Sequence, residues 1–383
     1  MSEVIIEKCN ENSIENSLGK LLEKLGGLNR YVSKGDKVFI KPNMLLNEKP
    51  ETGRTTHPGL VLALSKRLHE LGAVVTVGER NGNIENVFKD YGYQDICKYA
   101  KVVNLDNEEF ILVDPQAGNY VINFPLPIAK VVEEADFVIN MPGLRTHVLT
   151  NISNALKNVM GFLPRNTTRL VHLAGLDEAI VDLNRMIKVD LIITDAIYSL
   201  QGSFPANGGQ PLKTDFIMAS TDPVALDTVA AKIIGYQAED INSVVLAAKA
   251  GLGEMDINKI KIDGELKKYD FDLPKPANYE DEYKASLGIY SDNACDRCKR
   301  ALANGIFAFY QENNVDDPEL LKKINIIAGK SYPGELREGF NIIYGNCAKT
   351  YFGKGVFEPG CPPLTGAVKK RMKELYEELK ESQ

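Results

Sequence analysis

Several features that would define a class of protein are absent from this sequence. No apolar run approaches the ~20 residues needed to cross a bilayer. The first residues, MSEVIIEKCNENS, lack the basic start and apolar core of a secretory signal. We therefore expect a cytoplasmic protein without a membrane partner. The net charge of −7, with no basic block carrying interleaved aromatic residues, argues against a nucleic-acid partner.

Phosphate-binding signatures are also missing. No GxxxxGK[ST] loop is present, and no GxGxxG follows the first strand-like run. ATP hydrolysis and Rossmann-type NAD binding are therefore not expected. The 383 residues exceed the size of one ordinary core, so the length favours two domains.

The first part of the chain alternates apolar β-branched runs with helical periodicity. This pattern predicts an α/β fold with a mainly parallel layered sheet and helices on both faces. The expected strands are 4–7, 37–40, 74–77, 137–140, 190–194 and 216–219. The expected helices are 14–25, 58–71, 152–162, 176–186, 223–234 and 240–250. Residues 107–128 instead predict an antiparallel hairpin with strands at 110–113 and 120–124.

A segment rich in Lys, Asp and Pro at 266–285 predicts a linker. It divides the chain into a large α/β domain, 1–280, and a small C-terminal α/β domain, 281–383. In the small domain we expect a helix after Cys298, strands at 324–328 and 340–344, and a closing helix at 365–379.

Four of the six cysteines lie in the last quarter of the chain, at Cys295, Cys298, Cys347 and Cys361. Thiols stay reduced inside cells, so this set predicts zinc or an iron–sulfur cluster rather than two disulfides. Zinc ribbons usually have two close pairs, but only the first two cysteines form a C-x2-C pair. The other two cysteines, Cys9 and Cys97, are expected in the core.

The sequence around Cys361, Pro-Gly-Cys-Pro-Pro, separates these alternatives. It resembles the cluster-ligating turn of hydrogenase small subunits and of their relative in respiratory complex I. Prolines make such a loop rigid, and glycine lets the backbone approach the cluster sulfides. We therefore expect the four cysteines to bind a [4Fe–4S] cluster. A four-cysteine zinc site and a redox dithiol at Cys295 and Cys298 are the alternatives.

Short polar motifs follow several of the expected strands. Loops at the carboxyl ends of strands form the ligand crevice of an open α/β sheet, so we expect one site there for a small anionic ligand. The residues expected to act on the ligand are Lys41, His57, His147, Lys157 and His172. Those expected to bind a cofactor are Asn43, Arg145, Asp195 and Asp222.

Some of these residues also have simple structural interpretations. His57 is equally suited to cap the helix that begins at Pro58, and Asp222 suits the N-cap of the predicted helix 223–234. Asp227 lies either on the solvent-exposed face of that helix or on its inner face, where it could act as a ligand. The loop 201–210, rich in Gly and Pro, is either a lid or a long connecting turn.

The motifs KPN, TTHP, RTH followed by KN, and DPVALD together resemble the family called domain of unknown function 362. The similarity covers about residues 1–265. Many members of that family carry iron–sulfur ligands, so the resemblance implies a cluster but no settled substrate.

A more distant similarity is to the nickel-pincer lactate racemase family. His147, Lys157 and His172 have spacings like those of a His, the cofactor-anchoring Lys and the nickel-binding His of that family. The resemblance implies a second metal or an anionic cofactor in the crevice. Racemases use two His as acid and base, but Glu79 and Arg80 stand where the partner of His57 is expected. This departure argues against two-base proton transfer.

These observations lead to three functional hypotheses. The first is an iron–sulfur oxidoreductase or electron-transfer protein that connects an external electron donor, such as a ferredoxin, with the anionic ligand. The second is an isomerase or lyase that uses the cluster or another metal as a Lewis acid on a hydroxy- or oxo-acid. The third is a structural or assembly protein stabilised by a cluster or zinc. A second copy of the chain, giving a homodimer, is a further candidate partner.

Overall fold

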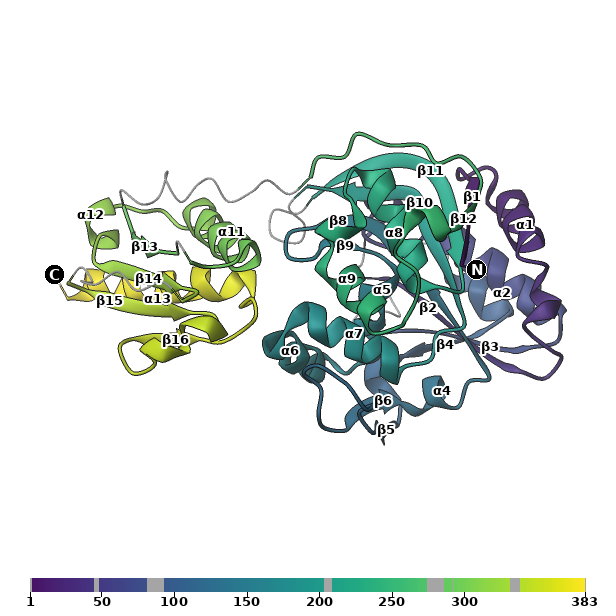
Figure 1. Ribbon diagram of the computed structural model, residues 1–383, viewed down its shortest axis with the longest axis horizontal. Helices are drawn as coiled ribbons and strands as arrows, with labels where there is room; N and C mark the ends of the chain where they lie inside the picture. Colours follow the sequence, from purple (N-terminus) through teal and green to yellow (C-terminus); the bar gives the residue numbers. More distant parts are fainter. Residues whose placement is uncertain are drawn as a thin grey trace.

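The computed structural model describes residues 2–44, 48–80, 93–202, 209–273, 286–291, 293–330 and 338–382. A large α/β unit and a small one lie side by side, with α11 of the small unit on the side toward the large unit (Figure 1). The predicted domain boundary at 280/281 and residues 203–208 of the predicted lid lie outside the described residues.

A mostly parallel sheet forms the centre of the large unit. Its described strands number ten, and its main path has the order β12-β1-β11-β10-β7-β2-β3-β4. Only β11 runs antiparallel to its neighbours on this path, so the predicted mainly parallel α/β class is confirmed. The strands are β1 (Glu3–Lys8), β2 (Lys37–Pro42), β3 (Val74–Glu79), β4 (Lys101–Asn104), β7 (Phe137–Met141), β8 (Gly143–His147), β9 (Asn151–Ser153), β10 (Leu191–Gln201), β11 (Gln210–Ser220) and β12 (Lys261–Asp263).

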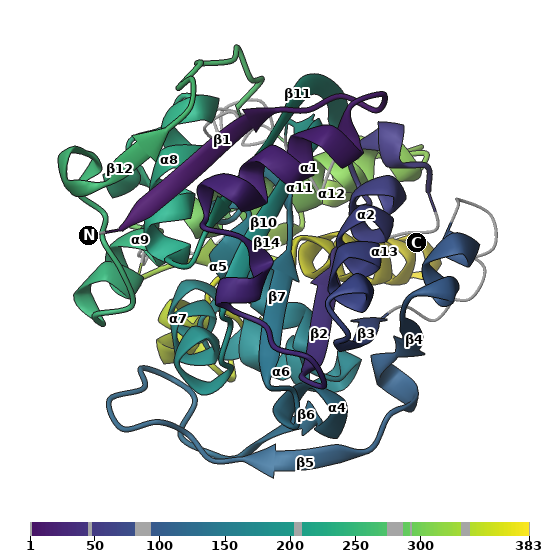
Figure 2. The same ribbon diagram turned by 90° about the vertical axis from the view of Figure 1, so that its right-hand side faces the viewer.

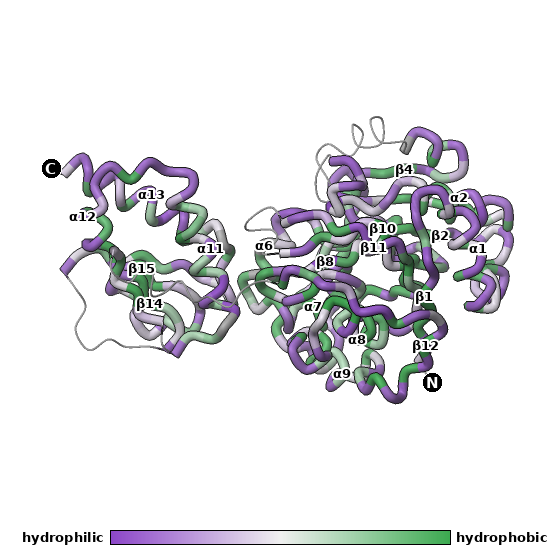
Figure 3. Tube along the Cα trace, turned by 90° about the horizontal axis from the view of Figure 1, so that it is seen from above, coloured by the Kyte–Doolittle hydropathy of each residue, from purple (hydrophilic) through white to green (hydrophobic). Residues whose placement is uncertain are grey.

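Helices cover both faces of this sheet, as predicted. Alternate strand residues point to opposite faces, so Phe39 of β2 packs in one hydrophobic core and its neighbours Val38 and Ile40 pack in the other. Helices α1 (Ile14–Lys24) and α2 (Pro58–Glu70) cover one face, in front of the strands in Figure 2. The other core includes α4 (Lys130–Glu133), α5 (Ala155–Asn158), α6 (Arg165–Ala174), α7 (Leu176–Met186), α8 (Pro223–Ile234) and α9 (Asn242–Lys249). Figure 3 shows hydrophobic residues concentrated along the central strands.

Two local predictions were wrong. The hairpin exists, but β5 (Phe110–Val113) pairs with β6 (Leu126–Ala129) and not with 120–124. The buried Asp182 carboxylate accepts the backbone N–H groups of 120, 121 and 122 at 2.7–2.9 Å, so these groups are not available to a strand. The predicted helix 152–162 is instead β9, then the short α5, then a 3-10 turn at Val159–Phe162.

Further 3-10 turns connect the elements. They are η1 (Leu28–Arg30), η2 (Pro50–Thr52), η3 (Tyr93–Lys98), η4 (Leu105–Asn107), η5 (Val159–Phe162), η6 (Ala238–Asp240), η7 (Ile257–Lys259) and η8 (Asn346–Tyr351).

The small unit is built on a parallel sheet of its own. Its described strands have the order β13-β14-β15-β16, and each neighbouring pair is parallel. The predicted strands 324–328 and 340–344 are confirmed as β14 and β15. The elements are β13 (Gly288–Tyr290), α11 (Asp296–Glu312), α12 (Pro318–Leu321), β14 (Ile324–Ala328), β15 (Phe340–Tyr344), β16 (Val356–Glu358) and α13 (Thr365–Glu381).

Candidate functional site

The carboxyl ends of β2, β3 and β7 bring polar side chains together at one edge of the large sheet. Lys41 in β2 lies opposite Asn140 in β7, and Glu79 ends β3. Because neighbouring parallel strands end at the same edge, loops there enclose a hollow. A cavity of about 250 Å³ lies at this edge, and we call it the crevice. Its lining residues are Lys41, Asn43, Met44, Glu79, Arg80, Asp106, Ser153, Lys157, Asn158, Met160, Gly161, Arg165 and Thr168.

A buried ion pair forms the floor of the crevice. Lys41 Nζ lies 2.6 Å from Glu79 Oε2 and donates a second hydrogen bond to the carbonyl of Pro42 at 2.9 Å. The Lys41 side chain is completely buried. Burial lowers its pKa, and the charge of Glu79 opposes that shift. The charge of Lys41 is therefore largely balanced within the protein.

Two other cations of the crevice are unpaired. Within the part of the chain that the structure describes, Lys157 and Arg165 form no ion pair or side-chain hydrogen bond. Burial and the charge of Arg145 together lower the pKa of Lys157 to about 8, against the opposing charge of Asp177. Lys157 is half-buried and Arg165 is exposed, and a partly desolvated cation without a partner favours an anion beside it. These two residues are the best anion-binding groups of the crevice.

Three asparagines form a chain of hydrogen bonds that ends at the crevice. Asn140 Nδ2 donates to the carbonyl of Ala155 at 3.0 Å, and Asn158 Nδ2 donates to Asn140 Oδ1 at 2.6 Å. Asn43 Nδ2 then donates to Asn158 Oδ1 at 2.9 Å. The last oxygen, Asn43 Oδ1, is buried and accepts no hydrogen bond from the described residues.

The short helix α5, which carries Lys157, is fixed by a residue far away in the sequence. Four residues cannot form a stable helix by themselves. The buried Asp227 of α8 accepts the backbone N–H groups of Ala155 at 2.9 Å and Leu156 at 3.1 Å. Burial raises the pKa of Asp227 to about 7, and the two backbone hydrogen bonds oppose the shift. Asp227 therefore positions Lys157 and does not line the crevice.

Asp222 is the N-cap of α8. Its Oδ1 accepts the backbone N–H groups of Val224 and Ala225, both at 2.9 Å. Its Oδ2 accepts from Ser2 Oγ at 2.6 Å and from the Glu254 backbone at 3.0 Å. Both oxygens are occupied, and Asp222 does not line the crevice.

Two of the histidines accept hydrogen bonds from nearby backbone N–H groups. His57 is the N-cap of α2, and its Nδ1 accepts the Gly59 N–H at 3.1 Å. His147 is buried, and its Nδ1 accepts backbone N–H groups of Leu149 at 3.2 Å and Thr150 at 3.3 Å. Neither side chain lines the crevice. His172 belongs to α6, but its side chain lies outside the described residues.

Arg145 and Asp195 are buried beside the crevice. Arg145 Nε donates to the carbonyl of Gly53 at 2.9 Å, and burial lowers its pKa to about 10. Asp195 accepts the backbone N–H of His57 at 2.6 Å and that of Ile197 at 3.0 Å. Burial raises the pKa of Asp195, and His57 opposes the shift. Both residues hold loops together.

Of the site residues expected from the sequence, Lys41, Asn43 and Lys157 meet at the crevice. Arg80 and Arg165 also line it and were not among the expected site residues. Arg80 ends the Gly-Glu-Arg turn after β3, and its guanidinium donates to the carbonyl of Leu163 at 2.9 Å. Arg165 follows a proline at the start of α6, a helix that the sequence pattern did not predict.

The four C-terminal cysteines gather at the carboxyl edge of the small sheet. Cys295 precedes α11 in the segment after β13, Cys347 follows β15, and Cys361 follows β16. These strands are parallel, so their following loops lie at the same edge. The loop of Cys347 is tied to that of Cys361, because the Asn346 N–H donates to the Gly360 carbonyl at 2.9 Å and Asn346 Oδ1 accepts the Gly360 N–H at 2.8 Å.

The thiols are close enough to affect one another. The hydrogen bond with Cys298 lowers the pKa of Cys295 to about 5. The pKa of Cys298 is raised, first by that hydrogen bond, then by burial and by the charges of Cys295, Cys361 and Cys347. A methyl group on Gly345 would be in ordinary contact with Cys298 Sγ at 3.5 Å, and it is the backbone φ of 91° that favours glycine there. Within the described residues, no three His, Cys, Asp or Glu side chains have the geometry to hold a metal ion.

All six cysteines are free thiols. The core position predicted for Cys9 is confirmed, since its side chain is buried at the end of β1. That predicted for Cys97 is wrong, because Cys97 is exposed in η3.

The cysteine edge of the small unit contacts the junction of α6 and α7 in the large unit. The Leu176 N–H donates to the carbonyl of Cys361 at 3.1 Å, and Asn346 Nδ2 donates to the carbonyl of Leu173 at 3.1 Å. Arg297, between Cys295 and Cys298, pairs with Asp177. The helix α6 therefore contacts the cysteine loops near its end, while Arg165 at its start lines the crevice.

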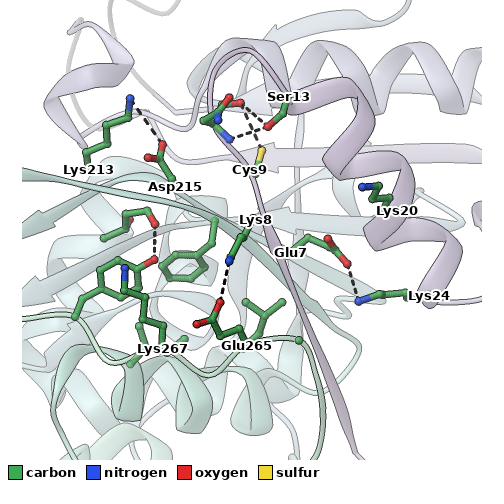
Figure 4. A pocket seen from close by; sticks show the side chains of 17 residues that line it. Glu7, Lys8, Cys9, Ser13, Lys20, Lys24, Lys213, Asp215, Glu265 and Lys267 are labelled. Carbon is green, nitrogen blue, oxygen red and sulfur yellow. Dashed lines mark hydrogen bonds and ion pairs between the residues drawn. The ribbon is translucent and has the colours of Figure 1, made fainter.

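A larger cavity of about 780 Å³ lies beside β1, α1 and β11 (Figure 4). It has many lysines, but acids neutralise several of them: Lys8 lies 3.0 Å from Glu265, and Lys24 lies 2.6 Å from Glu7. None of the site residues expected from the sequence lines this cavity. The smaller crevice, which the half-buried Lys157 lines without an ion pair from the described residues, is the stronger candidate site.

The fold and the crevice define an α/β protein with a cation-lined hollow at the carboxyl edge of its sheet. Residues 38–232 match the family described as "Domain of unknown function (DUF362)", and the chain belongs to this family. It is 28% identical over 285 residues to the thylakoid-associated protein sll1697 of Synechocystis sp., an alignment covering 68% of this chain and 86% of that protein.

Among solved structures, the chain is similar to the lactate racemase apoprotein of Thermoanaerobacterium thermosaccharolyticum, with 14% identity and a TM-score of 0.37. The match covers 51% of this chain and 50% of that one, so it spans only half of the racemase. A likeness this low does not assign an activity. Among the described residues, no helix combines the length and apolar character needed to cross a membrane.

Proposed function

We propose that this protein binds a [4Fe–4S] cluster through Cys295, Cys298, Cys347 and Cys361 and exchanges electrons with an anionic small molecule in the crevice. When bound, such a cluster accepts and donates single electrons. The chemistry of the donor set supports this group, because four thiols from three loops lie at one edge of a small sheet, although among the described residues no three of them are gathered closely enough in this structure to hold a metal ion. The prolines around Cys361 make its loop rigid, and the glycine lets the backbone approach the cluster.

The observation that carries the proposal is the position of α6. Arg165 at its start lines the crevice, and Leu173 near its end accepts a hydrogen bond from the loop of Cys347. Eight residues of α-helix span about 12 Å. A ligand held by Arg165 and Lys157 would thus lie one short helix away from the cysteine edge, which is a suitable separation for electron transfer through protein.

The protein's own residues have distinct tasks in this proposal. Lys157 and Arg165 attract the anion, and the ion pair of Lys41 and Glu79 keeps the floor of the crevice rigid and nearly neutral. Arg297 lies close enough to Cys295 and Cys361 to interact with their charges, so its positive charge would balance part of the negative charge of the thiolates. Cys295 and Cys347 are exposed, so an external donor such as a ferredoxin has access to the cysteine edge.

The first experiment tests the cluster. The full-length protein, purified without oxygen, should be brown and contain about four iron and about four sulfide per chain. Cys361→Ser should lower both contents, whereas Cys97→Ser, which changes an exposed cysteine away from the edge, should leave them unchanged. A colourless protein with one tightly bound zinc would refute the cluster.

A second experiment tests the redox role. Dithionite should bleach the visible absorption, and an added electron acceptor should restore it. A cluster that never changes its oxidation state would instead favour the isomerase, lyase or structural hypothesis. Binding of anions should be lost in Lys157→Met with the iron content unchanged; retained binding would remove the crevice from the proposal.

A further inference from the structure

We infer that the ligand of the crevice carries a hydroxyl or amino hydrogen-bond donor beside its anionic group, as 2-hydroxy and 2-amino acids do. This inference rests on the proposed function, since it concerns the anion that the crevice binds. It starts from the asparagine chain, whose direction is determined by chemistry.

A backbone carbonyl can only accept hydrogen bonds. The carbonyl of Ala155 therefore requires that Asn140 donates to it through Nδ2, which leaves Asn140 Oδ1 as an acceptor for the next amide. The same reasoning applies to Asn158 and then to Asn43. The network thus assigns the orientation of each amide group. Rotating Asn43 by itself would place two oxygens against each other.

Asn43 is also held by its backbone. Its N–H donates to Thr56 Oγ1, and its carbonyl accepts the N–H of Thr56, both at 2.8 Å. Asn43 thus has one fixed orientation and lines the crevice, and its Oδ1 is buried without a donor from the described residues. A buried acceptor without a donor weakens the folded state, and a bound donor would remove that cost.

The charges of the crevice add the second requirement. Lys157 and Arg165 are unpaired in the described part of the chain and favour a negative group. Of the two acids at the wall, Glu79 is already paired with Lys41, and Asp106 is exposed, with its charge acting on Arg80. The ligand must therefore place an anionic group toward Lys157 and a donor toward Asn43. A volume of about 250 Å³ limits it to a small molecule.

This arrangement should separate hydroxy acids from their oxo counterparts. Both carry the carboxylate, but only the hydroxy form has an O–H for Asn43 Oδ1. A site that is built to bond a donor rejects the analogue without it, because the buried acceptor is left unpaired. One such hydrogen bond corresponds to about tenfold or more in affinity.

The test is calorimetric titration of the anaerobically purified full chain with matched pairs. The probes are both enantiomers of malate against oxaloacetate, both enantiomers of lactate against pyruvate, and L-aspartate. We expect at least one hydroxy or amino acid to bind about tenfold or more tightly than its oxo counterpart. In Asn43→Leu this preference should fall to near unity while the oxo acid binds as before. Asn12→Leu, at an exposed asparagine outside the crevice, should keep the preference.

The outcomes separate the inference from the proposed function. Equal binding of the two forms to the unmodified protein, or a preference that persists in Asn43→Leu, would overturn the inference and leave the anion site intact. If no anion binds at all, the crevice of the proposed function fails as well. Iron and sulfide are measured on the same samples, so the cluster is judged independently. Should Asn43→Leu not fold, the comparison of the pairs in the unmodified protein still decides.

Discussion

Asp177 of α7 and Arg297 of α11 form an ion pair that joins the large unit to the cysteine edge of the small unit. The Asp177 side chain is 1% exposed and that of Arg297 is 22% exposed. Burial raises the pKa of Asp177, and the charge of Arg297 opposes this shift. Asn242 Nδ2 also donates to Asp177 Oδ2 at 3.3 Å. Among the described residues, Arg297 is thus the cation that forms an ion pair with this buried carboxylate.

Removing that cation should destabilise the protein. Arg297→Met leaves the buried charge of Asp177 without a partner, which we expect to cost about 3 kcal/mol of the free energy of unfolding. The double variant Arg297→Met with Asp177→Asn should lose much less, because no unpaired charge remains. Urea denaturation of the three proteins measures the coupling. Strictly additive losses would show that the pair does not interact.

A matched control for this pair is Arg300→Met. Arg300 donates to Asn151 Oδ1, a neutral group, from the same helix. Its removal leaves no buried charge unpaired, so the expected loss is about 1 kcal/mol. A loss as large as that of Arg297→Met would mean that general packing of α11, and not the ion pair, is responsible.

Asp227 should make the stability depend on pH. Its pKa is raised from 3.8 to about 7, so the folded state binds its proton more tightly than the unfolded state does. The contribution of Asp227 to the free energy of unfolding is therefore greatest below about pH 4. It decreases as the pH rises to about 7, by up to about 4 kcal/mol. Asp227→Asn should flatten this part of the profile, measured by urea denaturation between pH 4 and 8. An unchanged profile would contradict the assignment.

Lys157 should make anion binding depend on pH above neutrality. Its pKa is lowered to about 8, so the free protein loses this positive charge as the pH rises through 8. The dissociation constant of malate should be nearly constant below about pH 7 and should increase up to about tenfold per pH unit above 8. Calorimetry across this range measures the change. Lys157→Met should bind weakly at every pH, and a retained pH dependence would point to another group.

Gly161 leaves room for the buried lysine at the floor of the crevice. A Cβ at this position would lie 2.5 Å from both Cε and Nζ of Lys41. We expect Gly161→Ala to displace the lysine from Glu79 and to cost about 1–3 kcal/mol. Gly366→Ala is the matched control, since a Cβ there meets nothing within 4 Å and Ala favours a helix. It should stabilise the protein by about 0.5–1 kcal/mol. Thermal unfolding of both variants distinguishes the two effects.

Local patterns in the sequence predicted the strands and, through them, the edge where Lys41 and Lys157 meet. An apolar run of β-branched residues can be recognised within a single segment, without knowledge of its partners. For this reason β14 and β15 have the bounds that the sequence predicted. The predicted helix at 152–162 was less accurate. Asn151 has a φ of 64°, in the left-handed region, and the following residues pair with β8 before α5 begins.

Long-range partners explain why the rest of the site was not predicted. The asparagine chain joins Asn43, Asn140 and Asn158 from three separate parts of the sequence, and no local pattern indicates that they meet. The same is true of Asp227, which reaches α5 from another helix. His147 was expected to act on the ligand because of its sequence neighbours, but its Nδ1 accepts N–H groups two and three residues ahead.

The double role of the DPVALD segment affects how variants of this chain should be interpreted. Its first aspartate holds α8 and its last holds the helix of Lys157, yet neither touches the crevice. A screen for lost activity would therefore find this segment as readily as it finds Lys157. Only direct measurement of ligand contact would show that the segment is a support for the site and not a part of its binding surface.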